Sequence, residues 1–94
     1  SGVVPRPRAF WGPYQASKAG LESMVTAWVE ELAPTDIKVN LFDPGATATS
    51  MRAEAMPGED QSTLPPANEV GKSLAKLVLD NWDQSGERVT FRSI

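Results

Sequence analysis

The stretch Tyr14-Gln15-Ala16-Ser17-Lys18 places a phenol and an ammonium group four residues apart, at the start of a predicted long helix. Positions four apart lie on one face of an α-helix, with Cβ atoms about 5–6 Å apart. A lysine at this spacing holds a positive charge near the phenol, and a nearby cation favours the phenolate form of a tyrosine. Because a phenol in such surroundings suits general acid/base chemistry, Tyr14 and Lys18 are the candidate reactive pair.

The helix that carries this pair is predicted over residues 13–33. Pro13 suits a first helical position because a proline lacks the N–H that would be unpaired there, and Pro34 ends the helix. Apolar residues continue the face of the pair at spacings of three and four. This pattern predicts a buried stripe made of Leu21, Val25, Trp28 and Leu32.

A strand is predicted directly after the helix, over residues 37–42, where the chain is β-prone. A long helix joined at once to a strand is half of a β-α-β unit, which implies a parallel sheet and an α/β fold. Asp43-Pro44-Gly45 forms a sharp turn at the carboxyl end of this strand. Ligands of open α/β sheets bind outside such strand ends, so we expect a binding site at this turn.

The rest of the chain is predicted to hold a loop, a helix and a strand. Residues 46–66 are rich in Pro, Gly, Asp and Ser and include a short helix over 50–56, which makes them a candidate lid beside the site. A second amphipathic helix is predicted over 67–83. The alternation of polar and apolar residues over 87–92 predicts a half-buried or edge strand.

Composition excludes several classes of function. The chain has 94 residues, one domain or part of one, and its net charge of −3 with scattered basic residues gives no support to nucleic-acid binding. Cysteine and histidine are both absent, which rules out disulfides, thiolate chemistry, a histidine-based triad and a histidine-ligated metal site. No apolar run reaches the ~18 residues of a membrane span, and no signal peptide is visible. We therefore expect a cytoplasmic protein with no metal site and no membrane or nucleic-acid partner.

Three features, taken in order, resemble the classical short-chain dehydrogenase/reductase family. The pair Tyr14 and Lys18 stands in the context Tyr-x-Ala-Ser-Lys-Ala, Ser1 lies thirteen residues before the tyrosine, and the Pro-Gly turn leads to a threonine in a Pro-Gly-x-x-x-Thr pattern. Tyr-x-x-x-Lys alone arises often by chance, so the spaced combination carries the resemblance. It implies that residues 1–94 are the C-terminal, catalytic part of a Rossmann-like doubly wound parallel sheet, without the Gly-rich turn that holds a cofactor pyrophosphate.

The resemblance also implies roles for individual residues. Tyr14 would be the general acid/base while hydride passes to or from the nicotinamide of NAD or NADP, Lys18 would hydrogen-bond the nicotinamide ribose, and Ser1 would hydrogen-bond the substrate oxygen. Further cofactor contacts would come from Pro44, Gly45, Thr47 and Thr49. Substrate contacts are expected from Trp11, Met51 and Met56.

Structural interpretations stay open beside these roles. Phe10 and Trp11 would serve equally as a loop plug that packs on the core. The two threonines would serve as caps of a turn, and the two methionines as core filler.

The sequence supports hypotheses from different classes. The first is a NAD(P)-dependent oxidoreductase that interconverts a carbonyl and a secondary alcohol, with this chain as its catalytic part and inactive when isolated. The second is a non-catalytic, dimerising interaction module. A third hypothesis, a nucleotide-sugar epimerase or dehydratase, shares the Tyr-x-x-x-Lys pair, but the Pro-Gly-x-x-x-Thr pattern and the short tail argue against it.

The helix over 13–33 also predicts a partner subunit. Met24 and Ala27 lie off the face of Tyr14, so small and apolar residues occupy more than one side of the helix. In the resembling family this helix packs against its mate in a second subunit. The resemblance therefore implies a homodimer or homotetramer formed through helix 13–33.

Overall fold

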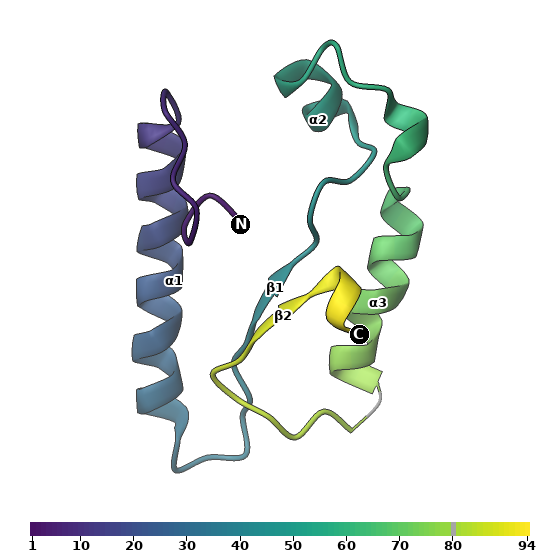
Figure 1. The fold of residues 1–94 in the computed structure, drawn as a ribbon. Coiled ribbons are helices and arrows are strands. Elements are labelled where there is room, and N and C mark those ends of the chain that lie inside the picture. Colours follow the sequence, from purple (N-terminus) through teal and green to yellow (C-terminus); the bar gives the residue numbers. More distant parts are fainter. Residues whose placement is uncertain (80) are drawn as a thin grey trace. The chain divides into compact units, whose positions relative to one another are not determined.

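A computed structural model describes residues 1–79 and 81–94. The chain divides into two compact units, one made of Ser1–Asp43 with Asp83–Val89 and the other of Pro44–Trp82 with Thr90–Ile94. The elements follow one another as α1 (Gly12–Leu32), β1 (Leu41–Asp43), α2 (Ser50–Ala55), a 3₁₀ helix (Gln61–Thr63), α3 (Ala67–Leu79), β2 (Arg88–Thr90) and a final 3₁₀ turn (Phe91–Ser93) (Figure 1). No helix in these described ranges is long and apolar enough to cross a membrane.

The long helix α1 runs from Gly12 to Leu32, against a predicted span of 13–33. Pro13 lies in its first turn, as the missing N–H of proline favours. The C-terminal end is set by Thr35, whose N–H and Oγ1 both donate to the Leu32 carbonyl, at 2.9 and 2.7 Å. Ala33 keeps helical dihedral angles as the C-cap, so the helix ends one residue earlier than its dihedrals alone would suggest.

The apolar stripe of α1 is less buried than its spacing predicts. Val25 is buried, whereas Leu21, Met24 and Trp28 are 42–46% exposed. The other buried apolar residues of this unit, Val3 and Val89, are small. Because a short chain buries a smaller fraction of its surface than a larger domain does, these two valines cannot cover a stripe of large side chains. The prediction of a continuous buried stripe is therefore wrong for these 94 residues.

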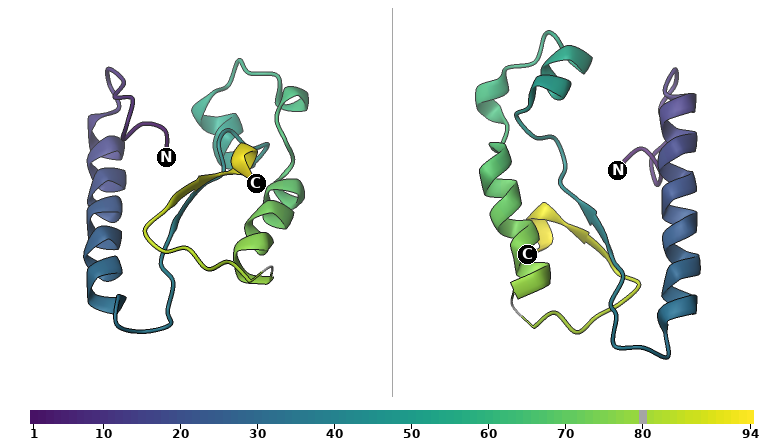
Figure 2. Two further views of the ribbon diagram at one scale, coloured as in Figure 1. Left: turned by 60° about the horizontal axis from the view of Figure 1, so that its bottom comes forward. Right: turned by 180° about the vertical axis from the view of Figure 1, so that it is seen from behind.

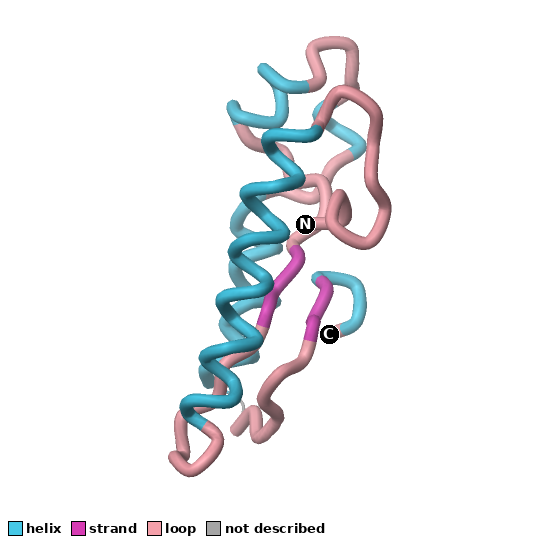
Figure 3. The backbone as a smooth tube through the Cα atoms, turned by 90° about the vertical axis from the view of Figure 1, so that its left-hand side faces the viewer, coloured by secondary structure: helices cyan, strands magenta, loops and turns pink. Residues whose placement is uncertain are grey.

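The strands β1 and β2 are neighbours in a two-stranded sheet and run in the same direction (Figures 1 and 3). The strand predicted over 37–42 is observed at Leu41–Asp43. Before Leu41 the backbone hydrogen bonds between the two strands are interrupted. The side chains of Ser85 and Asn40 hydrogen-bond backbone groups that would pair with each other in a longer strand. These bonds are Val39 N–H to Ser85 Oγ (3.0 Å), Asn40 Nδ2 to the Gln84 carbonyl (2.9 Å) and Glu87 N–H to Asn40 Oδ1 (3.0 Å).

The strand predicted over 87–92 is observed at Arg88–Thr90, with Val89 buried between two exposed neighbours. The chain then turns because the Thr90 N–H donates to Ser93 Oγ at 3.0 Å and Ser93 Oγ donates back to the Thr90 carbonyl at 2.9 Å. Before β2, Gly86 has a φ of +80°. This positive φ favours glycine, whereas a Cβ there would make ordinary van der Waals contact with Val29 Cγ1, at 3.4 Å.

The second unit contains α2, the two 3₁₀ turns and α3. Within the predicted loop 46–66, α2 occupies Ser50–Ala55 and a parallel bridge joins Ala48 to Pro66. The helix α3 covers Ala67–Leu79, against a predicted span of 67–83; position 80 lies outside the described residues. Asn81 has a φ of +53°, a left-handed conformation that ends helices. The C-terminal 3₁₀ turn lies beside α3 in both views of Figure 2.

Candidate active site

Tyr14 and Lys18 lie in the first two turns of α1, and the structure brings their side chains together. Lys18 Nζ is 5.5 Å from the centroid of the Tyr14 ring, over the ring face. This is the cation–π arrangement, in which the negative face of the ring attracts the ammonium group. Both side chains are half-buried. The i, i+4 spacing thus delivers the positive charge to the phenol ring.

Trp11 supports the Tyr14 ring from the residue that precedes α1. The two ring centroids are 5.6 Å apart and the planes meet at 83°, an edge-to-face contact. Phe10 behaves differently, because it is fully exposed and has a φ of +71°. The loop-plug interpretation is therefore wrong for Phe10, whereas Trp11 contacts the candidate acid/base itself. Nothing in the sequence indicated the left-handed backbone at Phe10.

Ser1 lies in the same unit and is held through its backbone and its side chain. Its Oγ accepts a hydrogen bond from the Val3 N–H at 3.3 Å, and its carbonyl accepts one from Arg88 Nη2 at 2.7 Å. Arg88 also pairs with Glu22 of α1. Arg88 therefore joins the Ser1 segment to the helix of Tyr14. Sequence reasoning did not single out Arg88, because its partners are 66 and 87 positions away.

The further cofactor contacts expected after the Pro-Gly turn belong to the second unit. Gly45 has a φ of +69°, which makes the sharp turn after Pro44 and favours glycine. Thr47 Oγ1 donates to the Gly45 carbonyl at 3.3 Å. Thr49 is the N-cap of α2, where its Oγ1 accepts from the Arg52 N–H at 3.2 Å. Both threonines therefore have the local structural roles that were the alternative, and no hydrogen bond donated by the Thr49 hydroxyl is seen among the residues that the structure describes.

The methionines expected to contact substrate also lie in the second unit. Met51 on α2 is exposed and Met56, the C-cap of α2, is half-buried. Core filling is therefore wrong for Met51. Among the described residues, no three His, Cys, Asp or Glu side chains are grouped so as to hold a metal ion.

Comparison with known proteins identifies the family to which the chain belongs. The short chain dehydrogenase family matches residues 1–60. An uncharacterized oxidoreductase, YciK of Escherichia coli K12, is 42% identical over 64 residues, which are 68% of this chain and 25% of that protein. A short chain dehydrogenase of Salmonella enterica serovar Typhi aligns with a TM-score of 0.89 and 32% identity over 98% of this chain and 38% of its own. A Shigella flexneri 2a homologue complexed with NADP aligns over the same shares with a TM-score of 0.88.

The chain belongs to the short-chain dehydrogenase family. The expected fold class is confirmed, because the helix with its parallel strand pair matches part of the Rossmann-like sheet of these enzymes. The chain spans a quarter to two-fifths of the length of these relatives.

Proposed function

We propose that this chain is the catalytic part of a NAD(P)-dependent oxidoreductase that interconverts a carbonyl and a secondary alcohol, with Tyr14 as general acid/base. The observation that carries the proposal is the Tyr14–Lys18 pair at the start of α1, with the ammonium 5.5 Å from the ring centroid. Membership of a dehydrogenase family supports the reaction class. The pair supplies the two things that the proton transfer needs: an ionisable hydroxyl and a cation close to the ring that carries it.

In the proposed reduction, the Tyr14 hydroxyl donates its proton to the carbonyl oxygen of the substrate. The nicotinamide cofactor supplies the hydride that reaches the carbonyl carbon, so the C=O double bond becomes an alcohol. Lys18 stabilises the negative charge left on the phenol oxygen, and the Ser1 hydroxyl donates a hydrogen bond to the substrate oxygen as charge develops there. In the reverse direction Tyr14 accepts the alcohol proton.

The donors of the chain fit a nicotinamide nucleotide. The Thr49 hydroxyl accepts from the Arg52 N–H and keeps a proton for a carboxamide or phosphate oxygen. The Gly45 turn brings backbone close to a ligand, because no side chain stands there. Lys18 supplies a cation for the ribose hydroxyls. Two structural neighbours are complexes with NADP and NADPH, which supports this cofactor class.

The proposal extends to the surroundings of the site. Residues 46–66 would act as a lid over bound substrate, with Met51 and Met56 as substrate contacts. The exposed Leu21, Met24 and Trp28 support a homodimer or homotetramer through α1, since apolar patches mark protein interfaces. The enzyme would work in the cytoplasm on a small-molecule carbonyl or alcohol.

The experiment that tests the proposal is Tyr14→Phe in the complete enzyme that contains this chain. The ring keeps its contacts with Trp11 and Lys18, so we expect the fold and the affinity for NADPH to stay nearly unchanged. Loss of the transferable proton should lower kcat by about 10²- to 10⁴-fold. Ser17→Ala is the matched control, because its hydroxyl donates only to the Tyr14 carbonyl, at 2.7 Å.

Retained turnover in Tyr14→Phe would remove Tyr14 from the proposed role. If the wild-type enzyme gives no nicotinamide-dependent absorbance change with any member of a carbonyl panel, the interaction-module hypothesis is the one that stands.

A further inference from the structure

The segment after the Pro-Gly turn contains a well-formed ion pair that the proposed reaction does not use. Arg52 on α2 donates two parallel hydrogen bonds to Glu59, from Nε to Oε1 at 2.7 Å and from a terminal nitrogen to Oε2 at 2.8 Å. The two side chains are 28% and 25% exposed. Fork-to-fork geometry of this kind adds directional specificity to the charge attraction.

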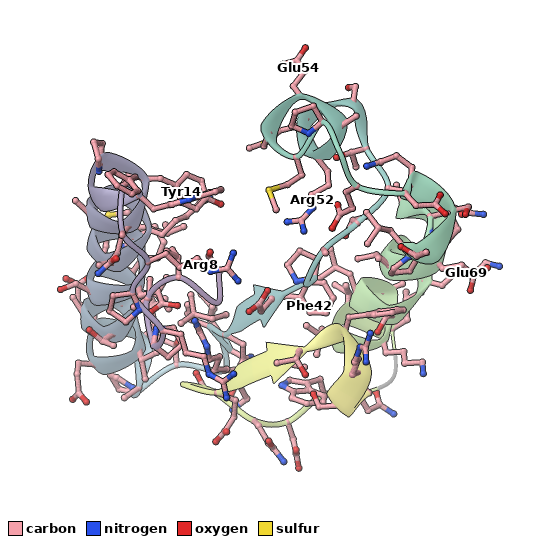
Figure 4. All side chains as sticks on the ribbon, turned by 45° about the horizontal axis from the view of Figure 1, so that its top comes forward. Arg8, Tyr14, Phe42, Arg52, Glu54 and Glu69 are labelled. Carbon is pink, nitrogen blue, oxygen red and sulfur yellow. The ribbon has the colours of Figure 1, made fainter. Side chains whose placement is uncertain are left out.

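The Arg52–Glu59 pair has no competing charge partner among the described residues. Glu54, on the same helix, points away from Arg52 (Figure 4). Asp60 is engaged by Ser62, whose N–H and Oγ donate to Asp60 Oδ1 at 3.0 and 2.7 Å. The Arg52 hydrogen bond lowers the pKa of Glu59, and Glu59 raises the pKa of Arg52, so the charged forms of both are favoured.

The pair matters because little else holds its surroundings. No residue from Pro44 to Pro66 is fully buried, so hydrophobic packing contributes little to fixing this segment. What fixes α2 is a set of polar contacts: the Thr49 cap, the Met56 N–H bond to the Arg52 carbonyl at 2.9 Å, and the ion pair. Segments with few buried apolar contacts open at low free-energy cost, so removal of one such contact should loosen the whole segment.

Arg52 takes part in each of these contacts. Its N–H is held by the Thr49 side chain, its carbonyl by Met56, and its guanidinium by Glu59. Because the Arg52 N–H donates to the Thr49 hydroxyl, the orientation of that hydroxyl depends on the position of the Arg52 backbone. When Glu59 holds the guanidinium, the first turn of α2 is held in place. The direction in which the Thr49 hydroxyl can donate its proton is then fixed as well.

We propose that the Arg52–Glu59 pair is a positioning clamp that holds the Thr49 hydroxyl in place for the nicotinamide cofactor. This inference rests on the proposed function, in which Thr49 contacts that cofactor. Neither Arg52 nor Glu59 touches the reacting atoms; both act through Thr49. The clamp should therefore affect cofactor binding rather than the chemical step.

The test uses Arg52→Met in the complete enzyme, with NADPH as the probe. Loss of the fork should raise the Kd and KM for NADPH about three- to tenfold and leave kcat within about twofold. Arg52→Lys keeps the charge without the paired bonds and should give a partial effect. Glu59→Gln should match Arg52→Met, and the double variant should be no worse than either single one.

The matched control is Lys72→Met. Lys72 and Glu69 form an ion pair in the same unit at 3.3 Å, but their side chains are 72% and 52% exposed. Such a pair is worth little, so Lys72→Met should leave NADPH binding unchanged.

A second measurement needs no turnover. Amide hydrogen exchange of the apo enzyme should be faster across residues 50–59 in Arg52→Met than in the wild type, and the reversed pair Arg52→Glu with Glu59→Arg should restore slow exchange. The clamp is refuted if Arg52→Met binds NADPH and exchanges like the wild type, or if Lys72→Met has the same effect. Failure of the proposed function would look different, because the wild-type enzyme would then show no turnover of any carbonyl.

Discussion

The contact between Trp11 and Tyr14 predicts that Trp11 determines how often the acid/base is correctly oriented. The perturbation is Trp11→Leu, which keeps an apolar side chain before α1 but removes the aromatic edge. The centroid separation of 5.6 Å and the angle of 83° fall in the range preferred by edge-to-face pairs. Such pairs contribute about 0.5–1.5 kcal/mol beyond their buried area.

This energy sets the expected size of the effect. Since about 1.4 kcal/mol corresponds to a factor of ten, loss of the contact should reduce the population of the aligned Tyr14 ring by about two- to twelvefold. The kcat of the complete enzyme should fall by the same factor, because a misaligned hydroxyl does not transfer its proton. The KM for NADPH should change little, and Trp11→Phe should recover most of the lost kcat.

The assay is steady-state NADPH oxidation with a saturating carbonyl substrate. Trp28→Leu is the matched control, because it removes the same kind of side chain from the helix that carries Tyr14, fourteen positions after that residue. A wild-type kcat in Trp11→Leu would refute the reasoning. So would an equal loss of kcat in Trp28→Leu, since that result would point to a general effect on α1.

Two further predictions concern the fold and the ion pair. Gly86→Ala should destabilise the enzyme by about 1 kcal/mol in thermal unfolding, because a left-handed alanine costs about 1–2 kcal/mol and only part of this cost is offset in the unfolded chain. Gly71→Ala in α3 should instead stabilise it by about 0.5–1 kcal/mol, since the helix interior has open space there; a stabilising shift at Gly86 would contradict the first expectation, and a destabilising shift at Gly71 the second. The pKa of Glu59 is lowered from its usual 4.5 by the Arg52 hydrogen bond, so its stabilising contribution is complete above that value and is lost as the pH falls through the lowered one. A carboxyl titration followed by NMR should show this lowered midpoint, and in Arg52→Met the midpoint should move back up; an unmoved midpoint would contradict the assignment.

Sequence reasoning worked best where the physics is local. The pairing of Tyr14 with Lys18 follows from helical spacing alone, and Pro13 marked the start of α1 to within one residue. The turn at Gly45 follows from the freedom of glycine to adopt a positive φ. These features need only neighbours within one or two helical turns, and the long helix followed at once by a strand predicted the parallel sheet.

Sequence reasoning failed where contacts between segments far apart in the sequence determine the local structure. The strand predicted from residue 37 begins only at Leu41, because Ser85 and the Asn40 side chain take up backbone groups across more than forty positions. The Arg52–Glu59 pair was missed for a different reason. A spacing of seven within an irregular loop has no periodicity to recognise, and the pair exists only because the chain turns after Met56.

Phe10, in the loop before α1, combines a left-handed backbone with a fully exposed side chain. A β-carbon in that region of dihedral space costs about 1–2 kcal/mol, and a benzyl group wholly in water returns none of it through packing. Glycine or asparagine would adopt these dihedral angles in the isolated chain at a lower free-energy cost. The cost of the left-handed dihedral angles at Phe10 is therefore not offset by packing against any of the described residues.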